Sequence, residues 1–99
     1  MQERLYTDKT EIMLAYQEGD RWNQISLTYD KMIHVAFEPV MERKFLRKVP
    51  GARIAITIAG REDPICIYRS KEKHFDQYLE DMRAFCKRNR VTVYDRLSR

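Results

Sequence analysis

Residues 70–89, SKEKHFDQYLEDMRAFCKRN, decide the fold, because they form the clearest amphipathic helix in the chain. Their apolar side chains recur at the spacing that places them on one stripe of a helix; they are Phe75, Tyr78, Leu79, Met82, Phe85 and Cys86. Ser70 fits the N-cap position, and Asn89 fits the left-handed position after the last turn. We expect a helix over about 71–88 that buries this stripe against a sheet.

The segments before this helix predict short β-strands. Residues 23–29 alternate apolar and polar side chains. In residues 10–17 Ile12, Leu14 and Tyr16 share one face, and in residues 33–37 Ile33, Val35 and Phe37 do so. Residues 53–59 and 65–69 flank the turn residues 60–64, which predicts an antiparallel hairpin. Residues 91–94 predict a further short strand after the helix.

Residues 40–49 fit two structures. Their alternation is poor, and Met41, Phe45 and Val49 would also fit one side of a short helix. We favour an edge strand, because its many basic side chains would discourage another sheet from pairing with it. The sequence Val49-Pro50-Gly51 predicts a turn before the next strand.

Length and composition indicate a soluble globular chain. Its 99 residues suit one domain over residues 1–99, and a hydrophobic content of 43% with 34% charged residues differs from that of a disordered chain. The first residues lack the apolar run of a secretory signal, and no apolar run reaches the roughly 20 residues that span a bilayer. We therefore expect a cytoplasmic location.

The order of elements, several antiparallel strands and then one long helix, resembles the pleckstrin-homology superfold, including its GRAM-like and bacterial pleckstrin-like members. The resemblance covers residues 10–89 and implies an α+β domain: an antiparallel bent sheet or partly open barrel of five to seven strands, capped by one C-terminal helix at about 71–88. The residues alone leave another sheet-plus-helix α+β layout open.

The residues that most often carry chemistry show no catalytic, metal or cofactor pattern. His34 is expected on a strand and His74 in the first turn of the helix, and the serines show no elbow-like glycine setting. The adjacent carboxylates Glu62–Asp63 and Glu80–Asp81 fit solvated positions. Cys66 and Cys86 lack the short spacing of a metal loop. We expect two reduced thiols, no cofactor and no enzymatic activity.

Charge is unevenly distributed along the chain. Residues 1–40 carry four basic and seven acidic side chains, whereas residues 41–99 carry fifteen basic and eight acidic ones. The densest basic cluster is the candidate site for an anion or a partner: Arg43, Lys44, Arg47 and Lys48, with Arg53 after them. The alternative is a set of solvated charges on an edge strand.

Trp22 is a candidate aromatic contact, because a Trp side chain often dominates an interface. The alternative, which we favour from the sequence, is that it closes one end of a small core. A second basic region comprises Lys87, Arg88, Arg90, Arg96 and Arg99. We disfavour nucleic acid as its partner, since Tyr94 is the one nearby aromatic for base stacking.

The sequence thus predicts a small interaction module. We expect it to bind a protein or peptide, either by strand addition at a sheet edge or in the groove between the last strand and the helix. The alternative is peripheral binding to an anionic membrane lipid or a nucleic acid through the basic cluster. An uncovered edge would also allow a homodimer.

Overall fold

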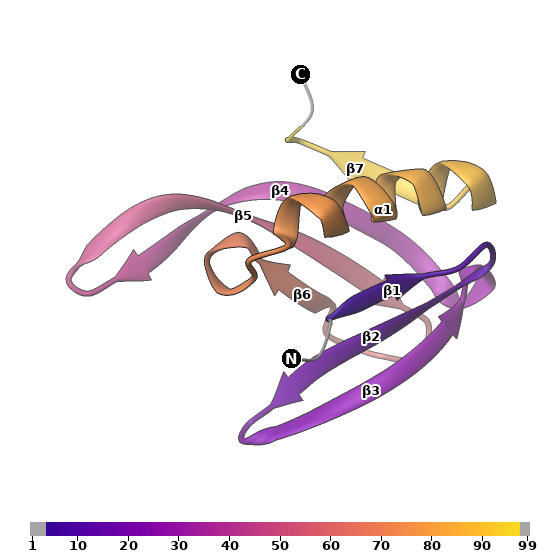
Figure 1. Cartoon of the computed structure of the whole chain (residues 1–99), viewed down its shortest axis with the longest axis horizontal. Coiled ribbons are helices and arrows are strands. Elements are labelled where there is room, and N and C mark those ends of the chain that lie inside the picture. Colours follow the sequence, from indigo (N-terminus) through magenta and orange to yellow (C-terminus); the bar gives the residue numbers. More distant parts are fainter. Residues whose placement is uncertain (1–3, 98–99) are drawn as a thin grey trace.

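The computed structural model describes residues 4–97, and for Lys44 it describes the backbone alone. Within these residues the chain forms seven strands, one α-helix and two short 3-10 turns (Figure 1). In chain order the elements are β1 (Leu5–Thr7), β2 (Glu11–Glu18), β3 (Arg21–Thr28), η1 (Tyr29–Lys31), β4 (Met32–Lys44), β5 (Arg47–Ile58), β6 (Ile65–Tyr68), η2 (Arg69–Lys71), α1 (Phe75–Asn89) and β7 (Thr92–Asp95). The predicted α+β fold with a helix near the C-terminus is confirmed.

The strands lie in two sheets. The first has the order β1-β2-β3 and is antiparallel, and the second has the order β6-β5-β4-β7. Strand β7 is parallel to β4, whereas β5 is antiparallel to both β4 and β6. β6 and β7 therefore run in the same direction at opposite edges of the sheet, and α1 is the crossover that connects them (Figure 1). Within residues 4–97 the two sheets do not close into a barrel.

Helix α1 buries the predicted stripe. All six of its apolar positions are buried, and they join the strands in one core. The helix begins at Phe75, later than predicted, and His74 is its N-cap residue in place of Ser70. Ser70 lies in η2, where its hydroxyl donates to Glu42 Oε1. The expected N-cap is wrong because the chain leaves β6 through η2 before the helix can begin.

The end of α1 also differs from the expectation. Arg90, not Asn89, takes the left-handed conformation, with φ 58° and ψ 37°. Asn89 is still helical, and its amide donates to the carbonyl oxygens of Lys9 and Phe85. These two hydrogen bonds occupy the side chain that we expected to favour the left-handed position.

Strand β4 contains a β-bulge near its start, so the side chains before the bulge lie on the opposite faces from those predicted. Met32 pairs with Ile58 and His34 with Thr57, so Ile33 is an extra residue on β4. Such a bulge shifts the side chains before it to the opposite face. Val35 and Phe37 are buried as predicted, but Ile33 is exposed and Met32 takes its place in the core.

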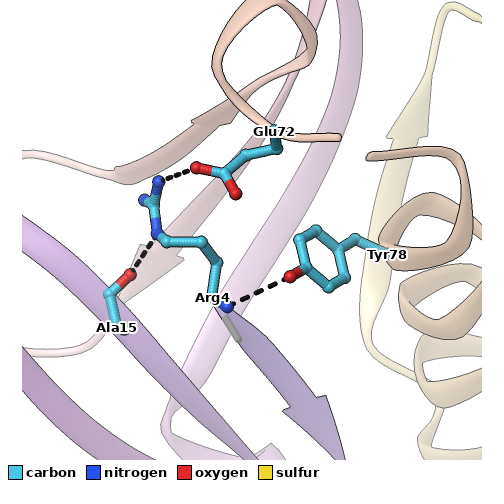
Figure 2. A network of polar contacts seen from close by, with 4 residues as sticks. All are labelled: Arg4, Ala15, Glu72 and Tyr78. Atoms are coloured by element: carbon cyan, nitrogen blue, oxygen red, sulfur yellow. Dashed lines mark hydrogen bonds and ion pairs between the residues drawn. The ribbon is translucent and has the colours of Figure 1, made fainter. Parts of the chain in front are cut away.

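Arg4 connects the first sheet to the helix region, as Figure 2 shows. Its backbone N–H donates to the Tyr78 hydroxyl at 3.1 Å, and its guanidinium donates to the Ala15 carbonyl at 2.6 Å. The same guanidinium pairs with the Glu72 carboxylate at 2.5 Å, and both side chains are about 15% exposed. Strand β1 was not predicted, because three residues are too few to establish an alternation.

Candidate functional site

A two-stranded arm projects from the second sheet (Figure 1). The pairing of β4 with β7 ends at Phe37, and the pairing of β5 with β6 ends at Arg53. Beyond these points, and among residues 4–97, β4 and β5 pair only with each other, from Pro39 opposite Ala52 to Lys44 opposite Arg47. We call residues 39–52 the β4–β5 arm.

The arm resolves the ambiguity of residues 40–49 in favour of strand. The turn predicted at Val49-Pro50-Gly51 is wrong, because these residues lie within β5 and the chain reverses at Phe45 and Leu46. In a two-stranded arm each strand has one edge without a neighbour, where a proline that lacks an N–H costs no ladder hydrogen bond. The Glu42 carboxylate occupies the space in which a side chain at position 51 would lie. Gly51 therefore permits side-chain packing within the strand, and it does not mark a turn.

The tip of the arm presents two apolar side chains to solvent. Phe45 is 91% exposed and Leu46 is 95% exposed, the two largest values among the exposed large hydrophobic residues of the described chain. Phe45 also has a φ of 57°. A bulky residue is strained in this left-handed region, by roughly 1–2 kcal/mol. The fold therefore places an aromatic side chain at the position where glycine would be the most stable residue.

Basic side chains surround this tip. Arg43 lies directly opposite Lys48, and Arg47 lies opposite Lys44. Because successive residues of a strand point to opposite faces, Arg43 and Lys48 share one face of the arm and Arg47 belongs to the other. Of the four clustered cations in the prediction, the structure thus brings these three to the tip, and the Lys44 side chain lies outside the described residues.

The carboxylates of the arm region are engaged with other side chains. Glu38 pairs with Arg53 at 2.7 Å, and Glu42 accepts the hydroxyl hydrogen of Ser70 in η2. Arg53 is the fifth residue of the predicted cluster, but the structure separates it from the tip. Hydrogen bonds to Tyr68 and to Glu38 raise the pKa of Arg53, so its charge is already engaged within the fold.

Trp22 is the other residue that the sequence singled out. It lies on β3 in the first sheet and is 53% exposed, so the core-closing interpretation is wrong. The Arg4 guanidinium lies 5.0 Å from the centre of its ring. Trp22 therefore belongs to a different sheet from the arm, and its ring is partly covered by a cation.

A cavity of about 400 Å³ lies between α1 and β7, at the groove where the sequence predicts peptide binding. Its lining is apolar at Phe37, Cys86, Val91 and Val93 and basic at Arg83, Lys87 and Arg90. Arg83 donates to both carboxylate oxygens of Asp95, at 2.9 and 3.1 Å. Among residues 4–97, β7 forms the outer edge of its sheet, so this groove borders a strand edge without a neighbour in that part of the chain.

Of the remaining candidates, His34 contacts neighbouring side chains and the two cysteines are partly or fully buried. His34 lies 3.2 Å from the Thr57 hydroxyl and packs edge-on against Tyr94. Both cysteines are free thiols, as predicted, and burial raises the pKa of Cys86 to about 11. Among residues 4–97, no group of histidine, cysteine and carboxylate side chains is arranged to hold a metal ion. Arg99 lies outside the described residues.

The exposed tip was not predicted from the sequence, although a local signal was present. Residues 43–48, RKFLRK, are symmetric: two basic residues, two apolar residues and two basic residues. In a continuous strand this pattern would be poor alternation, but in a hairpin it centres the apolar pair on the turn.

Within the described residues, no helix is long and apolar enough to cross a membrane. No protein-family model, curated protein or solved structure matches this chain.

Proposed function

We propose that this protein is a non-enzymatic interaction module that binds an anionic membrane surface through the tip of the β4–β5 arm. The observation that carries the proposal is the combination of Phe45 and Leu46, each more than 90% exposed, with cations on both faces of the arm beside them. An apolar tip with adjacent cations suits a surface that is apolar inside and negatively charged outside.

The expected binding is weak and reversible. Each basic side chain near an acidic leaflet contributes about 1 kcal/mol. Full burial of a Phe or Leu side chain contributes roughly 1.5–3 kcal/mol, and insertion into the headgroup region gains part of that. These favourable contributions are offset by the loss of translational and rotational freedom on association. The arm thus suits a protein that samples a membrane surface and leaves it again.

Nucleic acid fits the same tip less well. Proteins that bind single strands combine cations with several aromatic rings, on which successive bases stack. The tip offers one aromatic ring, Phe45, and the aliphatic side chain of Leu46 has no stacking face. The apolar pair is better explained by contact with lipid.

The test is co-sedimentation with vesicles. Wild-type protein is mixed with vesicles that contain phosphatidylserine and with neutral vesicles, at low and at moderate salt. We expect binding to the acidic vesicles alone, reduced at moderate salt because ions screen the surface charge. The variant Arg43→Glu, Arg47→Glu, Lys48→Glu should not bind, and Phe45→Ser with Leu46→Ser should bind several-fold more weakly at both salt concentrations.

A matched control carries the same change of charge elsewhere. The variant Lys87→Glu, Arg88→Glu, Arg96→Glu alters three exposed residues on α1 and after β7. It should bind acidic vesicles nearly as well as the wild type. Equal loss in this control would show attraction by net charge without a role for the arm. Absence of wild-type binding to acidic vesicles at low salt would refute the proposal.

A second candidate function is the capture of a peptide at the outer edge of β7. The cavity of about 400 Å³ between α1 and β7 favours it, since an added strand would place alternate side chains beside this cavity. Such binding depends on main-chain pairing and apolar contact, so it should respond little to salt. Sedimentation velocity would show whether the chain forms the dimer that pairing of a second copy at this edge would require.

A further inference from the structure

Strand β3 has a long free edge. It is an outer strand of the first sheet, and among residues 4–97 it pairs with β2 alone (Figure 1). Its eight residues contain no proline, its register with β2 is unbroken, and its one charged residue is Arg21, where the strand begins. Charges, prolines, bulges and short length are the features that usually prevent an edge from pairing with another strand. Beyond Arg21, β3 has none of them.

The other sheet edges of the described chain are less open to pairing. β1 has three residues, and β6 and β7 have four each. The two strands of the β4–β5 arm are longer, but each contains a proline, Pro39 in β4 and Pro50 in β5, and basic side chains surround their tip. Among residues 4–97, β3 is therefore the strand whose edge is best suited to accept a neighbour.

The hydrogen bonds between β2 and β3 show which backbone groups of β3 face outward. The Tyr29 N–H donates to the Thr10 carbonyl, one position beyond the pair of Thr28 and Glu11. In an antiparallel ladder, hydrogen-bonded and non-hydrogen-bonded pairs alternate. The odd-numbered residues of β3 therefore bond to β2, and the even-numbered residues direct their N–H and C=O groups toward the free edge. These residues are Trp22, Gln24, Ser26 and Thr28, and all four are exposed.

We propose that a second copy of this chain pairs with β3 at this edge, antiparallel and with the two-fold axis at Ile25. In this register Gln24 of each copy lies opposite Ser26 of the other, and Trp22 lies opposite Thr28. Four hydrogen-bonded pairs then form across the interface, each with two hydrogen bonds. A shift by two residues in either direction leaves three such pairs. A shift by one residue would place side chains of different faces opposite each other.

The side chains along this edge are also complementary. Ile25 is half-buried and packs against the core of its own copy. At the two-fold axis it faces Ile25 of the second copy in a non-hydrogen-bonded pair, in which side chains lie closest together. Asn23 lies opposite Leu27 on the same face. Residues 22–28 carry no charge, so like charges do not meet within the paired segment.

The dimer should be weak. Two paired edges cover less surface than the roughly 1,200–2,000 Å² of a stable interface, so we expect a dissociation constant in the micromolar range. Sedimentation velocity over a series from micromolar to millimolar protein measures it. The mean sedimentation coefficient should rise from that of a monomer to that of a dimer. A coefficient that stays at the monomer value at every concentration would overturn the proposal.

Two double variants at exposed positions test the edge. Gln24→Lys with Ser26→Lys places like charges opposite each other in the dimer, and Gln24→Glu with Ser26→Glu does the same with the opposite sign. Each variant alone should raise the dissociation constant about five-fold or more. The second variant also lowers the net charge, so the same loss in both excludes repulsion between whole molecules as its cause. An equal mixture of the two variants should form the dimer again.

A cysteine at the two-fold axis would test the register. In the dimer Ile25→Cys lies opposite itself, so it should form an intermolecular disulfide with oxidised glutathione, whereas Asn23→Cys lies opposite Leu27 and should not. The wild type gives the background from its two free thiols. Equal crosslinking of the two variants would contradict the register. The double variants at Gln24 and Ser26 retain the test if Ile25→Cys does not fold.

This dimer is independent of the proposed membrane binding. The β4–β5 arm belongs to the other sheet, so the arm variant Arg43→Glu, Arg47→Glu, Lys48→Glu should dimerise as the wild type does. Failure of the arm proposal and failure of this one are therefore distinguishable. A dimer that forms equally well in Gln24→Lys with Ser26→Lys would use another edge, such as β7, and would overturn pairing at β3.

Discussion

Arg43 and Lys48 lie directly opposite each other across the two strands of the β4–β5 arm. Like charges at facing positions of an antiparallel pair destabilise it, whereas opposite charges contribute roughly 0.2–1 kcal/mol. Neither residue has an ion pair among the described residues. The arm thus carries a repulsion that contact with an anionic surface would relieve.

Lys48→Glu should therefore change the stability of the chain and its binding to vesicles in opposite directions. The new carboxylate faces Arg43, so we expect the free energy of unfolding to rise by about 0.5 kcal/mol, while binding to acidic vesicles falls several-fold. Urea unfolding and vesicle co-sedimentation measure the two effects. The double variant Arg43→Glu, Lys48→Glu restores a like-charge pair and should lose the gain. Lower stability in the single variant would show that this repulsion is not significant.

A substitution at Phe45 should also raise stability while it weakens vesicle binding. Its φ of 57° lies in the left-handed region, where glycine carries no steric cost. Phe45→Gly should raise the free energy of unfolding by up to about 1 kcal/mol, because relief of strain is partly offset by the greater freedom of glycine in the unfolded chain. The same variant removes an apolar side chain from the tip and should weaken vesicle binding. Leu46→Gly is the control, since Leu46 is equally exposed but is not among the residues with positive φ.

Some features of the fold depend on local signals in the sequence, and others depend on residues far apart in the chain. The stripe of α1 was predictable residue by residue, because helix periodicity depends on near neighbours. The arm was harder to predict, because Pro50 and Gly51 usually mark a turn, whereas here they occupy a strand with one free edge. The bulge at Ile33 and the parallel pairing of β7 depend on partners far along the chain, so the local alternation of side chains does not indicate them.

The candidate site also has features that the sequence predicts locally and features that depend on the folded arrangement. The sequence located the cations of the tip, because a cluster of charge is visible in any order of residues. It did not separate Arg53 from them, since that depends on Glu38 and Tyr68 lying beside it in the folded sheet. The free edge of β3 exists because β3 and β4 lie in different sheets, so it could not be located before the arrangement of the strands was known.

A substitution at Glu72 would test how much the polar network shown in Figure 2 contributes to stability. Its carboxylate accepts from Arg4, and the two side chains are 15% and 14% exposed. Removing one partner of a buried pair costs about 3–5 kcal/mol, and we expect less here because the pair keeps some contact with solvent. Glu72→Gln should lower the free energy of unfolding by about 2 kcal/mol in urea unfolding. Glu80→Gln, on the exposed side of α1, is the matched control and should change it by less than about 0.5 kcal/mol.

Cys86 should make stability depend on pH in the alkaline range. Burial raises the pKa of this thiol from 9.0 to about 11. The folded chain therefore binds the proton more tightly than the unfolded chain does, so the stabilisation is fully present below pH 9 and is lost as the pH rises toward 11. The total effect is on the order of 2 kcal/mol. Other groups titrate in the same range, so the comparison is with Cys86→Ala, which is less stable at every pH but should show a flatter decline. Parallel pH curves for the two proteins would mean that Cys86 does not control this dependence.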